Sequence, residues 1–244
     1  MRHLSPAFRA QEGRLRSDRS GVALMEFAFA LPLVLFFALY GLEVGNFTLT
    51  HLRVSQAALN LADNAARVGL NSGLPTVQLR ELDINDTLEG ARLFGRPFKL
   101  TERGRITLSA LVRGQDGQQR IHWQRCLGLK RGTGWDSHYG TASLTDGTDN
   151  TAANSGRLRP QGMGPVGSEV NTPLPTPTMP TSAVMFVEVN YEYEPVAGLT
   201  WLATNRTRLH YIASFMVRDR RDLSQIYNPA PAATRYTCNR YTAA

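Results

Sequence analysis

The stretch RSDRSGVALMEFAFALPLVLFFALYGL, residues 16–42, decides how the rest of the chain is organised. Within it, Val22–Leu42 carries a single charged residue, Glu26. A helix of this length measures about 31 Å, which matches the roughly 30 Å hydrocarbon thickness of a membrane. A core helix of a soluble protein would carry polar residues on every turn, whereas Phe27–Leu42 has only Tyr40. The stretch therefore predicts one membrane-spanning helix.

The charges that flank this helix predict its orientation. Residues 1–21 carry five arginines against two acidic residues, and basic flanks stay on the cytoplasmic side of a membrane. We therefore expect a basic cytoplasmic leader at 1–21, a transmembrane helix at 22–45 and the rest of the chain outside the cytoplasm. A cleaved signal peptide is the alternative, but the apolar run is longer than the 7–15 residues typical of such signals.

The helical pattern continues beyond the membrane segment as an amphipathic extension, residues 46–70. Apolar residues recur there at spacings of four and three residues, which places them on one helix face: Val54, Ala58, Leu61, Ala65 and Val68. This stripe is expected to pack on a sheet. We expect Pro32 to kink the long helix and Gly69 to end it.

The remaining residues, 71–244, predict a small α+β head. A short helix is expected at Thr76–Arg92, and a hairpin turn at Asp116-Gly117. Strands are expected at Arg105–Val112, Arg120–Leu127, Ala183–Glu194 and Leu209–Arg218, with Val187, Val189, Tyr191 and Tyr193 on one face. Strands that follow one another without long helices between them favour an antiparallel sheet. A connecting turn or short helix with Trp201 is expected at Gly198–Ala203. Residues 128–181, rich in Gly and Pro, predict a long exposed loop.

The chemistry-bearing residues favour a protein that is not an enzyme. The five histidines are scattered, no nucleophile motif is present, and no ligand spacing predicts a metal or cofactor site. The net charge of +7 is diffuse outside the leader, which argues against nucleic-acid binding. Cys126 and Cys238 both lie beyond the membrane segment, where disulfides persist. The two thiols are therefore either bridged or free.

The basic run, Gly21, four residues and then Glu26-Phe27, followed by a long apolar helix with an early proline, resembles the TadE/TadG-like proteins of tight-adherence pilus systems. The later segment VEVNYEYEPV, residues 187–196, is similar to a strand near the end of those domains. The resemblance implies a pilin-like fold, in which the long N-terminal helix packs on a small antiparallel sheet. The short chain, which lacks an Asp-x-Ser-x-Ser sequence, fits the TadE-like minor pseudopilins best.

The family resemblance also implies how the chain is processed and what it meets. A prepilin peptidase would cut after Gly21 and leave Val22 as the new N-terminus, and Glu26 would act in assembly with neighbouring subunits. The implied partners are that peptidase, other pilins and pseudopilins, the pilus assembly platform and inner-membrane lipid. The head would then be periplasmic or extracellular.

Two alternatives remain open at the level of the sequence. Glu26 either pairs with an amine after cleavage or lies among the lipid headgroups with its carboxylate in water. The whole chain is either a processed minor pseudopilin or an unprocessed, single-span binding protein whose loop at 128–180 recognises a ligand or partner. Processing at Gly21 separates the two functions.

Overall fold

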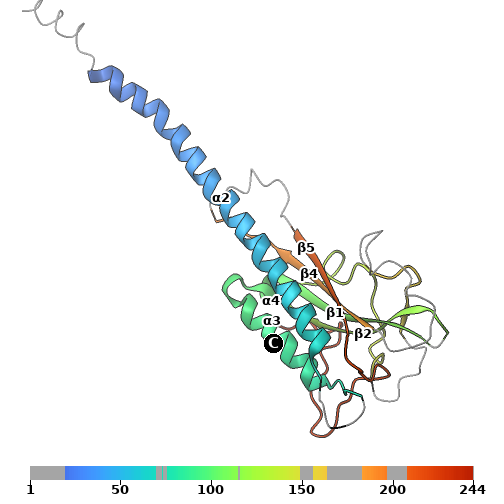
Figure 1. Cartoon of the computed structure of the whole chain (residues 1–244). Helices are drawn as coiled ribbons and strands as arrows, with labels where there is room; N and C mark the ends of the chain where they lie inside the picture. The colour runs from blue at the N-terminus through green and yellow to red at the C-terminus, as the bar shows by residue number, and fades with distance from the viewer. Residues whose placement is uncertain are drawn as a thin grey trace, which may run out of the picture. The chain divides into compact units, whose positions relative to one another are not determined.

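The computed structural model describes residues 20–69, 73, 76–114, 116–148, 156–163, 183–196 and 208–243. The chain divides into two compact units (Figure 1). One unit holds the start of the chain up to Asn46 together with the short segment Pro195–Leu199, and the other holds Phe47–Glu194 and Thr200–Ala244. Most of the predicted leader lies outside the described residues.

The first described element is a single long helix, α2, which spans Ser20–Arg67. It includes both the predicted membrane segment and most of the amphipathic extension, so one long N-terminal helix is confirmed. The helix continues through Pro32, and the kink expected there stays a prediction. By length and composition α2 could cross a membrane, and its most apolar window is entirely exposed.

The second unit contains a five-stranded antiparallel sheet in the order β3-β2-β1-β4-β5 (Figure 1). The strands are β1 (Gly104–Arg113), β2 (Gln119–Leu127), β3 (Arg157–Leu158), β4 (Ala183–Glu192) and β5 (Arg208–Met216). Four of them match the predicted strands, and the α+β class is confirmed. The short β3 was not predicted, because a two-residue strand has no periodicity. The expected turn forms at Gly117, whose positive φ of 77° suits glycine.

One face of the sheet packs against helices. The stripe of α2 and the helix α3 (Glu81–Gly95) form a core with alternating residues of β1 and β4. In the chain, α3 is followed by two short helices, η1 (Arg96–Phe98) and α4 (Leu100–Arg103). The predicted apolar face is confirmed: Val187, Val189 and Tyr191 of β4, and Tyr193 just after the strand, all belong to this core.

The predicted start of the second helix was wrong by several residues. Instead of beginning at Thr76, α3 begins at Glu81, because the preceding residues pair with the C-terminal part of the chain. Val77 forms a parallel bridge with Arg221, and Arg80 forms one with Tyr227. The sequence pattern of a single helix could not show these distant partners.

The prediction of an exposed loop at 128–181 was also wrong for part of its length. Ala142 and Met163 are buried in a second apolar cluster on the opposite face of the sheet, with Leu111 and Phe186. Gly147 packs so closely on Trp123 that an added Cβ would lie 2.4 Å from the Trp123 Cβ. An irregular segment can thus cover a sheet with single apolar residues. Residues 149–155, the Pro-rich end at 164–182 and the turn at Gly198–Ala203 lie outside the described residues.

Candidate functional site

The predicted processing site lies in the first turn of α2. Gly21 and Val22 are exposed, Val22 by 55%, and an added Cβ on Gly21 would meet no atom within 4 Å. The first N–H groups of a helix have no partner within the helix, so its first turn unwinds at the lowest cost. The structure therefore leaves space around Gly21, and its cleavage stays a prediction.

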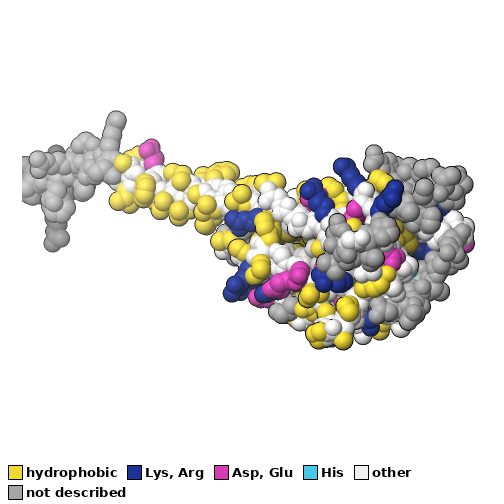
Figure 2. Space-filling view, turned by 60° about the horizontal axis from the view of Figure 1, so that its bottom comes forward, with side chains coloured by type: hydrophobic (Ala, Val, Ile, Leu, Met, Phe, Trp, Pro, Cys, Tyr) yellow, Lys and Arg dark blue, Asp and Glu magenta, His cyan; other side chains and the backbone are white. Residues whose placement is uncertain are grey.

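Glu26 lies one turn after Val22 on the same side of α2, because residues four apart are neighbours on a helix. Its side chain is exposed, and it has no hydrogen bond or ion pair with any residue in the described part of the chain. The nearby side chains of this segment are almost all apolar. Figure 2 shows an acidic side chain at the beginning of the apolar helix, on a surface that is otherwise hydrophobic.

The surface of Val22–Leu42 is apolar on all sides. Its large side chains are exposed by 38–72%, and Leu24 and Phe29 reach the highest value. The aromatic residues contact each other along the helix, with Phe36 stacked on Tyr40 at a centroid distance of 6.3 Å. Such a surface is stable only in lipid or against other apolar helices.

The C-terminal half of α2 is fixed to the sheet within the second unit. The predicted stripe is confirmed: Val54, Ala58, Leu61 and Ala65 are exposed by 2% or less, and Val68 packs partly buried against the same core. The buried guanidinium of Arg221 donates hydrogen bonds to the carbonyl oxygens of Ala65 and Ala66, at 2.9 and 3.0 Å.

These two bonds satisfy carbonyl groups that the last turn of a helix leaves without intrahelical partners, and a cation is favoured at that end. Aromatic contacts fix the other end of this half. The ring of Phe47 meets Tyr193 edge to face, and His51 Nδ1 lies 2.5 Å from the Tyr211 hydroxyl. Both ends of the head part of α2, residues 47–67, are therefore held by residues distant in the sequence.

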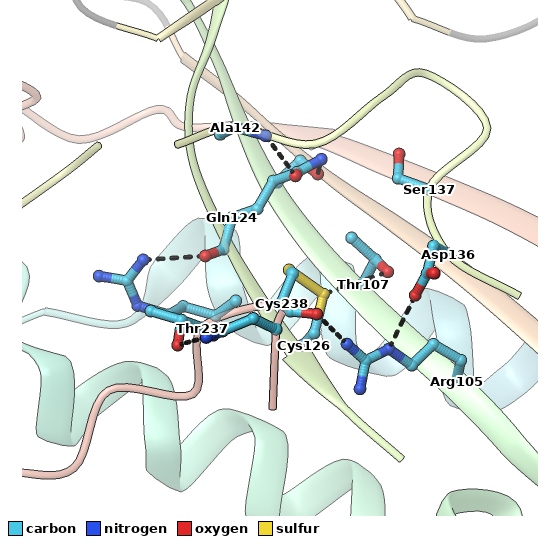
Figure 3. Close-up of a disulfide and its surroundings, with 12 residues drawn as sticks. Arg105, Thr107, Gln124, Cys126, Asp136, Ser137, Ala142, Thr237 and Cys238 are labelled. Carbon is cyan, nitrogen blue, oxygen red and sulfur yellow. Dashed lines mark hydrogen bonds and ion pairs between the residues drawn. A yellow bond between two sulfur atoms is a disulfide. The ribbon is translucent and has the colours of Figure 1, made fainter. Parts of the chain in front are cut away.

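The two cysteines are joined by a disulfide in the structure (Figure 3). The bond attaches the segment Tyr236–Thr242, here called the C-terminal strap, to β2. The strap also pairs by its backbone with β2 and the residue after it: the Cys126 N–H donates to Tyr236 O, and the Gly128 N–H donates to Thr242 O, both at 2.7 Å.

Arg105 of β1 anchors the strap from inside the protein. Its fully buried guanidinium donates to the carbonyl oxygens of Cys238 at 2.6 Å, Arg240 at 2.7 Å and Gly128 at 2.9 Å. Burial lowers the pKa of Arg105, while Asp136, at 3.6 Å, counteracts this effect. Sequence reasoning treated Arg105 only as the first residue of a strand, because its acceptors come from backbone far along the chain.

A second buried cation joins α3 to the sheet. Arg125 and Glu81, exposed by 1% and 0%, form a bidentate ion pair, with Arg125 Nε donating to Glu81 at 2.9 Å. Arg235 approaches the same carboxylate at 3.4 Å. An isolated buried charge is costly, so loss of either partner would weaken the contact between α3 and β2. No local pattern predicts this pair, because its residues lie 44 positions apart.

On the second face of the sheet, the described titratable residues bond to nearby backbone and polar side chains. Burial raises the pKa of Glu188, and hydrogen bonds from the Ser137 hydroxyl and the His138 backbone N–H act in the opposite direction. The hydroxyl of Ser137 thus donates to a carboxylate, and in the described part of the chain it has no hydrogen bond to a histidine ring. His210 instead contacts Asn190 at 2.8 Å.

Metal-ligating residues do not converge in the described ranges either, where no group of three or more His, Cys, Asp or Glu could hold an ion. The chain's distinctive surface is therefore the apolar helix with Gly21 and Glu26. Comparison of the chain with models of protein families, with curated proteins and with solved structures gives no match.

Proposed function

We propose that the chain is a non-enzymatic, TadE-like minor pseudopilin that supports the assembly of tight-adherence pili. One observation carries the proposal. A single helix, α2, begins with Gly21 and Glu26, continues as a fully exposed apolar surface, and ends as a stripe buried on an antiparallel sheet. A subunit that is held in a membrane and then assembled through its helix needs both the exposed part and the part attached to a head.

The position of Glu26 supports processing after Gly21. A carboxylate close to the hydrocarbon costs a few kcal/mol unless it is solvated or paired. Cleavage after Gly21 would create a free α-amine on Val22, one helical turn before Glu26. That amine, on the same chain or on a neighbouring subunit, is a charge partner of opposite sign. Before cleavage the described residues offer Glu26 no such partner.

The apolar part of α2 supports the proposal about the partners of the subunit. Before cleavage, Val22–Leu42 lies in the inner membrane, with the N-terminus in the cytoplasm and the head in the periplasm. Prepilin peptidase acts on the Gly21–Val22 bond. Afterwards the same surface packs against helices of other pilins and pseudopilins at the assembly platform, where apolar side chains again exclude water.

Replacing Glu26 with alanine tests the proposal. We expect E26A to enter the membrane normally but to give fewer pili and to lose co-purification with other pilins. The matched control is M25A, which shortens an adjacent side chain that is 60% exposed without changing charge. Normal pilus yield and normal co-purification of E26A would mean that Glu26 merely reaches the headgroup zone.

The rival function, an unprocessed anchored protein that binds a ligand through residues 128–180, has less support. The described parts of that segment, 128–148 and 156–163, place Ala142 and Met163 in a buried cluster rather than on a free surface. The segment thus contributes to the fold of the head. Discrimination between the two functions rests on whether Gly21 is cleaved.

A further inference from the structure

The head part of α2, residues 47–67, carries large apolar side chains on two opposite faces as far as Leu59. One face is buried on the sheet. The other carries three leucines that are about half exposed: Leu49 at 53%, Leu52 at 53% and Leu59 at 48%. The buried face is marked by Phe47, Val54 and Leu61, which follow one another at intervals of seven residues. A helix that needed only to attach the head would carry polar residues on its outer face.

The exposed leucines belong to a regular pattern in the sequence. Alternating spacings of four and three residues connect eleven positions, here called the α2 seam: Leu24, Ala28, Leu31, Leu35, Ala38, Leu42, Gly45, Leu49, Leu52, Gln56 and Leu59. This is the spacing of the contact positions of a coiled coil, which keeps one side of a helix facing a partner helix. Gln56 is the one polar member.

We propose that the α2 seam pairs in parallel with the α2 seam of a second copy of this chain. The inference rests on the proposed function only in that Val22–Leu42 lies in a membrane. From Leu24 to Leu59 a helix measures about 54 Å, well beyond the roughly 30 Å of hydrocarbon. A partner must therefore present an apolar stripe first in lipid and then in water.

A second copy of the chain meets this requirement in register. Two copies that enter the membrane with the same orientation have parallel helices, so Leu49, Leu52 and Leu59 of one meet the same residues of the other. The small residues Ala38 and Gly45 allow the backbones to approach closely in the lipid part. A pair of Gln56 amides, each a donor and an acceptor, would fix the register as polar seam residues do.

The area of such a contact is sufficient for a specific pair. A strip about 10 Å wide and 54 Å long covers roughly 540 Å² per chain, or about 1,100 Å² in total, above the roughly 1,000 Å² of a specific interface. The stretch from Leu42 to Leu59 alone would supply only about half of this area. Pairing therefore needs the full chain in a membrane.

Cysteine crosslinking in membranes tests the proposal. Leu52→Cys and Leu59→Cys place thiols in the seam, and Asn60→Cys places one on the exposed surface beside it. The described residues contain no free cysteine, because Cys126 and Cys238 are bridged, so an added thiol reports alone. After mild oxidation of membranes that contain the full chain, L52C and L59C should give a dimer band several-fold stronger than N60C.

Three results would overturn the inference: equal crosslinking of L59C and N60C, no crosslinking of L52C or L59C although maleimide labels both, or a crosslinked band that contains a different protein. The mature N-terminus is determined on the same membranes. A chain that is cut after Gly21 but does not crosslink contradicts the seam and leaves the proposed function standing. A chain that crosslinks but retains residues 1–21 supports the seam and contradicts the proposed function.

Discussion

Leu61 gives the sharpest test of how α2 is fixed to the head, because its side chain is 2% exposed in the centre of the buried stripe. Leu61→Ala removes about three carbon groups at roughly 0.8 kcal/mol each and leaves a cavity, so the free energy of unfolding should fall by about 3 kcal/mol. The change keeps helix propensity, since alanine is the best helix former. The loss of unfolding free energy in this variant therefore measures the packing of α2 on the sheet.

The matched control is Leu82→Ala in α3, where the leucine is 50% exposed. This substitution should cost less than about 1 kcal/mol, because little apolar area returns to water. Urea unfolding of the full chain in mild detergent, followed by tryptophan fluorescence to which the buried Trp123 contributes, measures both variants. A loss below about 1 kcal/mol for L61A, or equal losses for both variants, would refute the packing of α2 on the sheet.

Three further changes probe the head. Glu81→Gln leaves the buried Arg125 without its counter-ion and should cost about 3–5 kcal/mol of unfolding free energy in urea; a loss under 1 kcal/mol would contradict this. Cys238→Ser opens a bridge across 112 residues and should cost about 2–4 kcal/mol, a value that reductant should reproduce in the wild type but not in the variant. The pKa of His210 is lowered by partial desolvation of its ring and by the neighbouring His138 and Arg208, although the residue is exposed in β5. Its small contribution to stability is therefore complete above about pH 6.5 and is lost as the pH falls through the lowered value; H210Q should weaken the dependence of the unfolding free energy on pH between these limits, and an unchanged dependence would argue against the shift.

The parts of the fold that were predicted correctly are those with a regular period. The apolar run of α2, its stripe at spacings of four and three, and the alternation in β1 and β4 each repeat over many residues, so local sequence is enough. The hairpin at Asp116-Gly117 was predicted because a two-residue signal of this kind has few structural alternatives.

The parts that were missed depend on partners far away in the sequence. Arg105 is buried because the C-terminal strap brings three carbonyl oxygens to it, and Arg125 is buried because α3 brings Glu81. Neither arrangement has a local pattern. The predictions for the start of α3 and for residues 128–148 were wrong for the same reason. Contacts with Arg221 and Tyr227 determine where α3 begins, and the contact with Trp123 holds Gly147 against the sheet.

The candidate site also has one part that the local sequence predicts and one part that only the structure shows. Gly21 and Glu26 were identified from their order before an apolar run, and the structure adds that both are exposed and that Glu26 has no partner among the described residues. The outer leucines of the α2 seam became visible only when the structure showed which face of the helix the head covers.

The mature N-terminus is the measurement that tests the central claim most directly. The chain is purified from membranes of a strain with active prepilin peptidase and of a strain without it, and the N-terminal peptide is identified by mass spectrometry. We predict that the first strain gives a chain that begins at Val22 and the second a chain that retains residues 1–21. Retention of residues 1–21 in both strains would contradict the pseudopilin function and favour a permanently anchored protein.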